Sequence, residues 1–184
     1  MRCTAVLSAL VLTGGLLGPS SALAAEDDLG GNRWIAVEDH FAFVLPDGET
    51  FTEDDAPMEG VDEIPPVGSR LFLSEVLHEA KDGNKPGDEV GRTHIECTAQ
   101  VVPVNFLCDV AFVFASGSQL HGTVLVDFSS TEETPAPLEF DIPVTGGTDD
   151  FFGATGEVSV LDITADPGAA TTTLYEADIR LAHD

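Results

Sequence analysis

The 184-residue chain has few basic side chains: 7 Lys and Arg stand against 33 Asp and Glu, which gives a formal net charge of −26. Nucleic acids and anionic lipid surfaces are themselves densely negative, so a chain of this sign repels both. We therefore expect neither nucleic acid nor an anionic membrane surface as a partner. The acidity also indicates a well-solvated surface, and it identifies no function by itself.

Cysteine is scarce as well, with three in the whole chain. Cys97 and Cys108 are the two that lie beyond the N-terminal segment, and two cysteines do not complete a zinc site. His94 and His121 fall at polar positions of neighbouring segments, together with Glu96, but two solvated histidines on strands more often bind nothing. The sequence thus predicts no metal site.

Long apolar runs are missing after the N-terminus. The chain opens with Arg2, an apolar run at 5–17, and the small residues Ala22-Leu23-Ala24. This order is typical of a secretory signal, and the run is shorter than the roughly 20 residues that cross a bilayer. We expect a signal peptide at 1–24 to be cleaved. A single secreted domain at 25–184 would remain, with no membrane attachment.

Sustained helical periodicity is also missing from this domain, and strand patterns take its place. Eight segments alternate apolar and polar residues or are rich in β-formers: 33–45, 67–78, 91–101, 106–115, 119–128, 138–144, 155–163 and 171–182. Short strands at even spacing are typical of an all-β sandwich or barrel. The connection at 46–66 carries many acids and prolines and is predicted to be a flexible loop.

The two cysteines test how two of these strands pair. If 91–101 and 106–115 form a hairpin around residues 102–105, facing positions sum to 205, and 97 + 108 = 205. Cys97 and Cys108 would then lie opposite each other on one face, where a disulfide can form; two buried thiols are the alternative. The same parity predicts an inward apolar face made of Ile95, Cys97, Ala99, Val101, Phe106, Cys108, Val110, Phe112 and Phe114.

The next two strands continue this alternation. Their predicted inward residues are Leu120, Val124, Val126, Phe128, Leu138, Phe140, Ile142 and Val144. Eight antiparallel strands that close on themselves leave a lumen that either fills with side chains or holds one small ligand. Gly146 and Gly147 precede no helix, so they form no phosphate loop, and no cofactor is expected. Their predicted role is backbone geometry that only glycine allows.

Five short motifs follow one another after residue 67. They are GSRLFLSEVLH at 68–78, VGR at 90–92, FVFASG at 112–117, QLHG at 119–122 and PVTGGTDDFFGATGE at 143–157. This series resembles the allene oxide cyclase barrel and dirigent-like superfamily, especially its secreted bacterial members, over about 68–181. The resemblance implies an eight-stranded antiparallel barrel, which agrees with the strand count.

The resemblance also implies which polar side chains point into an otherwise apolar lumen. A first-strand carboxylate of the family falls at Glu38 or Asp39 of this chain, a lumenal Asn aligns with Glu75, and a lumenal Cys aligns with Cys97. The alternation of the first strand favours Asp39 over Glu38, since it shares parity with the apolar residues Ile35, Val37, Phe41 and Phe43. A slip of one residue, or a place at the wet rim, is the alternative for either predicted acid.

One element of the family's lumen is missing here. Its lumenal Tyr falls near Val126 or Phe128, neither of which has a hydroxyl, so true allene oxide cyclase activity is not expected. Tyr175 lies in register with inward residues of the last strand and could place its phenol in the lumen or at the rim. Since plant relatives form dimers or trimers, the resemblance also implies a homo-oligomer.

Two functions remain open at this stage. The first is a barrel that binds a small apolar molecule, either as a carrier or as a cofactor-free isomerase or cyclase, with Asp39 and Glu75 as acid and base. The predicted ligand-lining residues are Phe41, Cys97, Phe112, Val126, Phe128 and Tyr175. The second is a non-catalytic extracellular barrel with a filled lumen, acting through its surface.

Overall fold

The structure is a computed structural model that describes residues 33–52, 65–102, 105–128, 137–165 and 169–182. The predicted signal peptide and most of the predicted acidic loop lie outside these residues. The strands are β1 (Arg33–Val44), β2 (Thr50–Thr52), β3 (Arg70–Lys81), β4 (Lys85–Ala99), β5 (Asn105–Phe114), β6 (Gln119–Asp127), β7 (Glu139–Thr148), β8 (Thr155–Asp162) and β9 (Thr172–Arg180). The 3₁₀ turn η2 (Asp149–Phe151) follows β7.

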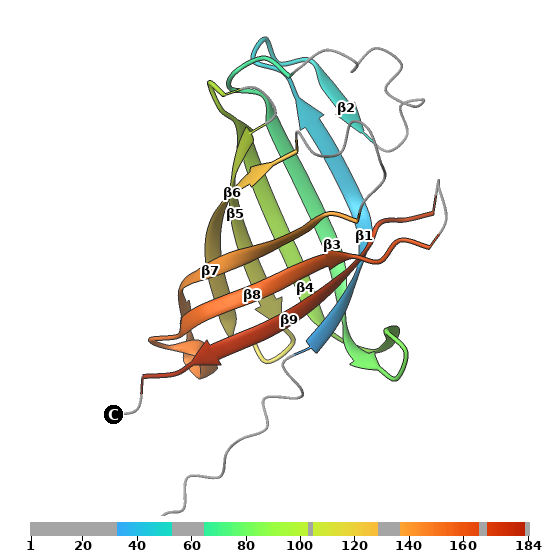
Figure 1. The fold of residues 1–184 in the computed structure, drawn as a ribbon, viewed down its shortest axis with the longest axis vertical. Helices are drawn as coiled ribbons and strands as arrows, with labels where there is room; N and C mark the ends of the chain where they lie inside the picture. The colour runs from blue at the N-terminus through green and yellow to red at the C-terminus, as the bar shows by residue number, and fades with distance from the viewer. Residues whose placement is uncertain (1–32, 53–64, 103–104, 129–136, 166–168, 183–184) are drawn as a thin grey trace, which may run out of the picture.

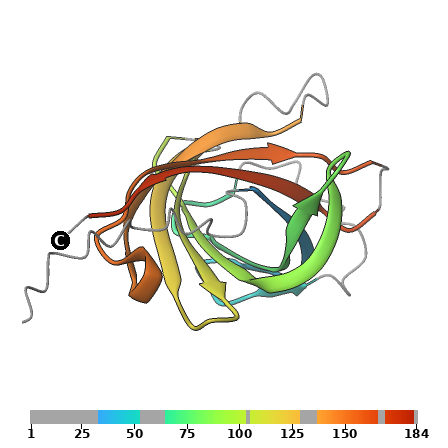
Figure 2. The ribbon, with the colours of Figure 1, turned by 90° about the horizontal axis from the view of Figure 1, so that it is seen from below.

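Eight of the nine strands close into an antiparallel barrel. The strand order is β2-β1-β3-β4-β5-β6-β7-β8-β9, and an additional pairing joins β1 to β9. Figure 2 shows the strands as a ring, and Figure 1 shows β7, β8 and β9 crossing β3 to β6 at a steep angle. The eight predicted segments are the eight barrel strands, so the predicted all-β barrel is confirmed. The short β2, inside the predicted loop, was not expected.

A bulge divides β1 into two halves with different neighbours. The first half pairs with β9 from Arg33 to Val37, whereas the end of the strand, from Ala42 to Val44, pairs with β2. The register with β3 shifts between Glu38 and His40, which leaves one residue of β1 without a partner in the ladder. A bulge of this kind inverts which side chains face inward beyond it, and it lets β1 leave β9.

The interior has two packed regions. Near the start of β1, Trp34 and Phe114 lie 5.3 Å apart between ring centroids, and Phe114 stacks on Phe151 of η2 at 4.9 Å. Phe112 and Tyr175 meet edge to face at 5.1 Å in the same region. We call this the aromatic plug. The second region surrounds Cys97 and Cys108 and contains Phe43, Ala99, Phe106 and Val126.

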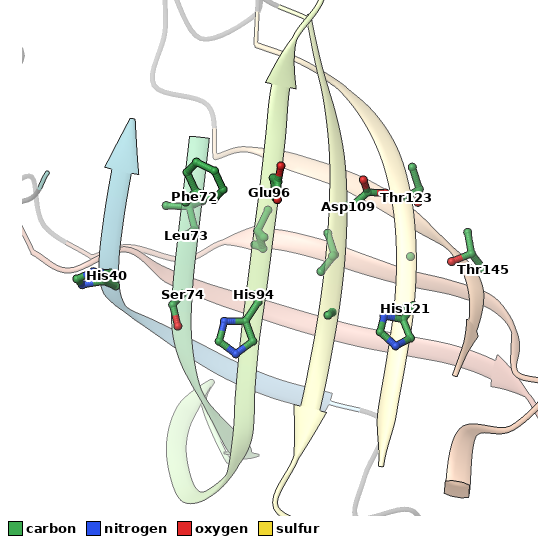
Figure 3. A pocket seen from close by; sticks show the side chains of 14 residues that line it. His40, Phe72, Leu73, Ser74, His94, Glu96, Asp109, His121, Thr123 and Thr145 are labelled. Atoms are coloured by element: carbon green, nitrogen blue, oxygen red, sulfur yellow. Dashed lines mark hydrogen bonds between the residues drawn. The ribbon is translucent and has the colours of Figure 1, made fainter. Parts of the chain in front are cut away.

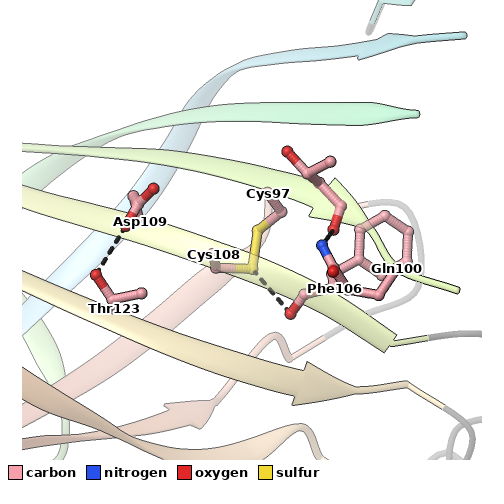
Figure 4. The surroundings of a disulfide bond; sticks show 7 residues. Cys97, Gln100, Phe106, Cys108, Asp109 and Thr123 are labelled. Atoms are coloured by element: carbon pink, nitrogen blue, oxygen red, sulfur yellow. Dashed lines mark hydrogen bonds between the residues drawn. A yellow bond between two sulfur atoms is a disulfide. The ribbon is translucent and has the colours of Figure 1, made fainter. Parts of the chain in front are cut away.

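The predicted hairpin and disulfide are confirmed. Cys97 lies opposite Cys108 in the β4–β5 ladder, and the two sulfurs form a disulfide that joins neighbouring strands (Figure 4). The predicted inward face is buried or half-buried from Ile95 to Ala99 and from Phe106 to Phe114. Val101 is the exception: it is 82% exposed, because β4 ends at Ala99 and the chain has already left the ladder.

Gly147 supports the structural interpretation of the Gly146-Gly147 pair. A Cβ at Gly147 would lie 2.5 Å from the Gln119 carbonyl oxygen and 2.5 Å from Cβ of Phe151. Both contacts are too close for any side chain, so glycine allows β7 to approach β6 and η2 to fold against the plug. Among the described residues, no helix is long and apolar enough to cross a membrane.

Candidate functional site: the lumen

A cavity of about 160 Å³ lies in the lumen between the two packed regions. Tyr175, in the aromatic plug, lies at one end of the cavity, and the disulfide between Cys97 and Cys108 lies at the other end. Its lining comes from all eight barrel strands and from residues that flank them. The lining residues are Glu38, Leu71, Leu73, Glu75, Ile95, Cys97, Cys108, Val110, Val124, Val126, Phe128, Leu138, Phe140, Ile142, Val160, Asp162, Thr171, Thr173 and Tyr175.

The lining divides into an apolar wall and a polar wall. Strands β4 to β7 supply aliphatic side chains, two phenylalanines and the disulfide. The polar side chains come from the adjoining strands β8, β9, β1 and β3, where Asp162 pairs with Thr173 and Glu38 pairs with Glu75. A molecule in this cavity would therefore meet carbon and sulfur on one side, and carboxylate and hydroxyl oxygens beside Leu71, Leu73 and Val160 on the other. Such a lining can orient a ligand that has one polar end.

Glu75 is the centre of the polar wall. Only 3% of the residue is exposed, and three hydroxyl groups donate to its carboxylate. Tyr175 donates to Oε2 at 2.7 Å, Thr173 donates to Oε1 at 3.1 Å, and Thr93 donates to Oε2. Hydrogen bonds to a carboxylate are stronger than those between neutral groups, so this network fixes the position of the buried acid.

Tyr175 supplies the one phenol of the chain, and it is buried. Burial raises the pKa of Tyr175 well above the usual value of 10.0, and the nearby Glu75 carboxylate raises it further. The phenol consequently keeps its proton at any physiological pH and acts as a donor to Glu75. A group with this geometry can also return a proton to a bound molecule.

The prediction of Asp39 as the inward acid of the first strand is wrong. Asp39 is exposed and forms an ion pair with Arg92 on the outer surface. Glu38, the alternative, lines the cavity. The bulge is the reason: Trp34, Ala36 and Glu38 have one parity before it, and Phe41 has the other parity after it, although all of them face inward.

Four of the six predicted lining residues line the cavity: Cys97, Val126, Phe128 and Tyr175. Phe112 does not, because its ring lies in the aromatic plug, where it is 1% exposed. Phe41 packs against the disulfide region and also lies outside the lining. Thr93 and Thr173 were not predicted, since a single threonine on a strand carries no signal until the register places it beside an acid.

A second and larger hollow, of about 600 Å³, lies on the outer face of the barrel (Figure 3). We call it the outer groove. His40, His94 and His121 stand in one row across it, on β1, β4 and β6, with Ser74 and Ala111 between them. Each histidine is thus two strands from the next. Within the part of the chain that the structure describes, no three His, Cys, Asp or Glu side chains are close enough to hold a metal ion.

Comparisons with known proteins return structures but no sequence match. No protein-family model matches the chain, and no curated protein matches it. A pyocyanin demethylase is similar in structure, with 20% identity and a TM-score of 0.49 over 80% of this chain and 98% of the other.

Two pterocarpan synthase dirigent proteins are also similar, both with a TM-score of 0.46. One is 16% identical over 77% of this chain and 84% of its own, and the other is 18% identical over 78% and 92%. By its own strand order the chain is a closed eight-stranded antiparallel barrel.

Proposed function

We propose that this chain is an exported barrel that binds one compact, mostly apolar molecule in its lumen, with the polar end of that molecule at Glu75. The observation that carries the proposal is the cavity itself, which lies inside the barrel and combines an apolar wall with a buried carboxylate held by three hydroxyl donors. A well-formed apolar pocket with a few convergent polar groups is the usual form of a small-molecule binding site.

The size of the cavity limits the ligand. Pockets for drug-sized molecules usually measure roughly 300–1,000 Å³, and this lumen measures about 160 Å³. A molecule with one ring, or a short branched chain, matches it. A long fatty-acyl chain would need the barrel to widen.

Export is part of the proposal. The N-terminal pattern predicts a signal peptide, and the disulfide between Cys97 and Cys108 requires an oxidising compartment to persist. Both point to a protein that works outside the cytoplasm. The homo-oligomer implied by the family resemblance belongs to the same proposal.

Cofactor-free isomerisation of the bound molecule is a second candidate, and the contact between Glu75 and Tyr175 favours it. In such a step the Glu75 carboxylate takes a proton from one carbon of the ligand, and the proton is delivered to another carbon, so atoms and charge balance. Enclosure in one orientation supplies the remaining rate enhancement. Incorporation of solvent deuterium into the recovered ligand would separate a catalyst from a carrier.

Native mass spectrometry of the secreted protein, mixed with small-molecule extracts, tests the binding proposal. We expect one small molecule to be retained per barrel. Val124 lines the lumen and its neighbour Thr123 lines the outer groove, so Val124→Phe and Thr123→Phe form a matched pair.

The pair assigns any retained molecule to one hollow. Val124→Phe should abolish retention, and Thr123→Phe should leave it unchanged. Val124→Leu serves as a milder filling variant if the phenylalanine overpacks the lumen. Retention that survives both lumen variants and is lost in Thr123→Phe would contradict the proposal.

A further inference from the structure

The charges around the lumen are all of one sign. Three carboxylates, Glu38, Glu75 and Asp162, line the cavity, and none of its described lining residues is Lys, Arg or His. Described basic side chains that form ion pairs do so on the outer surface, as Arg70 does with Glu96 and Arg92 does with Asp39. Every charged side chain in the described part of the lining is therefore acidic, which favours a negative potential in the lumen.

Two of these acids face each other directly. Glu38 and Glu75 are partners in the β1–β3 ladder, and directly opposed side chains on one face have Cβ atoms roughly 4.5–5.5 Å apart. Like charges in this arrangement repel, and the burial of Glu75 strengthens the repulsion. A positive group placed between them would relieve it.

The third acid extends the same wall. Asp162 pairs with Thr173, whose hydroxyl donates to Glu75, so the acids follow one another across β8, β9, β1 and β3. The opposite wall carries no charge. The negative potential is thus concentrated on one side of the lumen, where it would meet only one end of a bound molecule.

We infer that the natural ligand is a cation: a compact apolar body that carries a protonated amine or another cationic nitrogen group, which lies against Glu38 and Glu75. This inference rests on the proposed lumen site and specifies its ligand class. Carboxylates, including fatty acids, are excluded by the same electrostatics, because no lining group compensates a second negative charge. The acidic surface of the whole chain adds to the selection by attracting cations.

Three ligands with one carbon skeleton test this inference: cyclohexylmethylammonium, cyclohexylmethanol and cyclohexanecarboxylate, each titrated into the full-length secreted protein by calorimetry. We expect the ammonium ion to bind at least about tenfold more tightly than the alcohol. The carboxylate should show no measurable binding.

Two variants show which acids are responsible. Glu38→Gln removes one lumen charge and leaves the three donors of Glu75 in place, so ammonium affinity should fall on the order of tenfold while alcohol affinity stays within about threefold. Asp109→Asn removes a charge from the outer groove and should change neither affinity. A purely structural effect of Glu38→Gln would lower both affinities together.

Each result has a distinct meaning. If the carboxylate or the alcohol binds as tightly as the ammonium ion, the charge inference is wrong and the lumen site stands. If none of the three binds, or if Asp109→Asn alone removes ammonium binding, the proposed lumen site is wrong.

Discussion

The outer groove is larger than the lumen, but the chemistry of the lumen is better suited to binding a ligand. The groove measures about 600 Å³ and the lumen about 160 Å³. Yet the groove is an open hollow on the outer face, with an exposed His94 and Glu96 in its lining. The lumen is less open than the groove and holds a carboxylate that is 3% exposed.

Solvent explains why the smaller hollow is the better candidate. In the groove, water competes for every hydrogen bond and screens every charge, so each contact contributes little. In the lumen the same contacts lie in a low-dielectric surrounding, where a correctly placed acid discriminates strongly between ligands. Enclosure and buried polar groups therefore identify a site more reliably than volume does.

The largest expected effect is a difference in unfolding free energy between a substitution in the packed interior and one on the outer surface. Phe112→Ala removes a ring that is 1% exposed and packs on Trp34 and Tyr175, so it should lower the free energy of unfolding by about 3–5 kcal/mol. Leu125→Ala, on a side chain that is 58% exposed, should change it by no more than about 0.5 kcal/mol. Urea denaturation measures both. Equal losses would mean that the plug is not packed as described.

A smaller loss of stability is expected when an acid of the lumen is replaced, and a still smaller one when an acid of the outer groove is replaced. Glu75→Leu leaves the hydroxyls of Thr93, Thr173 and Tyr175 without their acceptor, which should cost about 1–3 kcal/mol of unfolding free energy. Asp109→Leu releases the hydroxyl of Thr123 to water and should cost no more than about 0.5 kcal/mol. A Glu75→Leu protein as stable as the wild type would show that the network does not hold the acid.

The smallest effect is a dependence on alkaline pH. Because the pKa of Tyr175 is raised in the folded state, its contribution to stability is complete below the unfolded value of about 10 and is lost as the pH rises through the folded pKa. Since the chain has one Tyr, tyrosinate absorbance reports this residue alone.

The folded protein should thus show little tyrosinate at pH 10, and the denatured protein should be about half ionised there. Tyr175→Phe should remove the signal and the associated loss of stability. Half ionisation of the folded protein at pH 10 would place the phenol in water.

Much of the barrel could be predicted because the residue numbers of facing positions in an antiparallel hairpin have a constant sum. The positions of Cys97 and Cys108 fix the register of one hairpin, and that register fixes the inward face of β4 and β5. Even spacing of turns then gives the number of barrel strands. These signals are local, so the sequence carries them directly.

At the bulge in β1 the regular alternation of inward and outward side chains is interrupted. Alternation assigns Asp39 to the inward face, but an extra residue at Glu38–His40 inverts the parity, so Glu38 enters the lumen and Asp39 pairs with Arg92. Nothing local marks the bulge, since it arises where β1 leaves β9. The donors to Glu75 were missed because they depend on pairing between strands: Thr93 lies opposite Glu75 in the β3–β4 ladder, and Thr173 lies on β9, which reaches β3 only when the sheet closes through β1.

The ultraviolet difference spectrum of Tyr175 tests the central claim most directly, because its phenol lines the lumen and no other tyrosine exists. Titration with cyclohexylmethylammonium, which does not absorb in this range, should shift the tyrosine band along a saturable curve that matches the calorimetric affinity, and Tyr175→Phe should lose the shift. Calorimetric binding that leaves the tyrosine band unchanged would contradict the assignment of the ligand to the lumen.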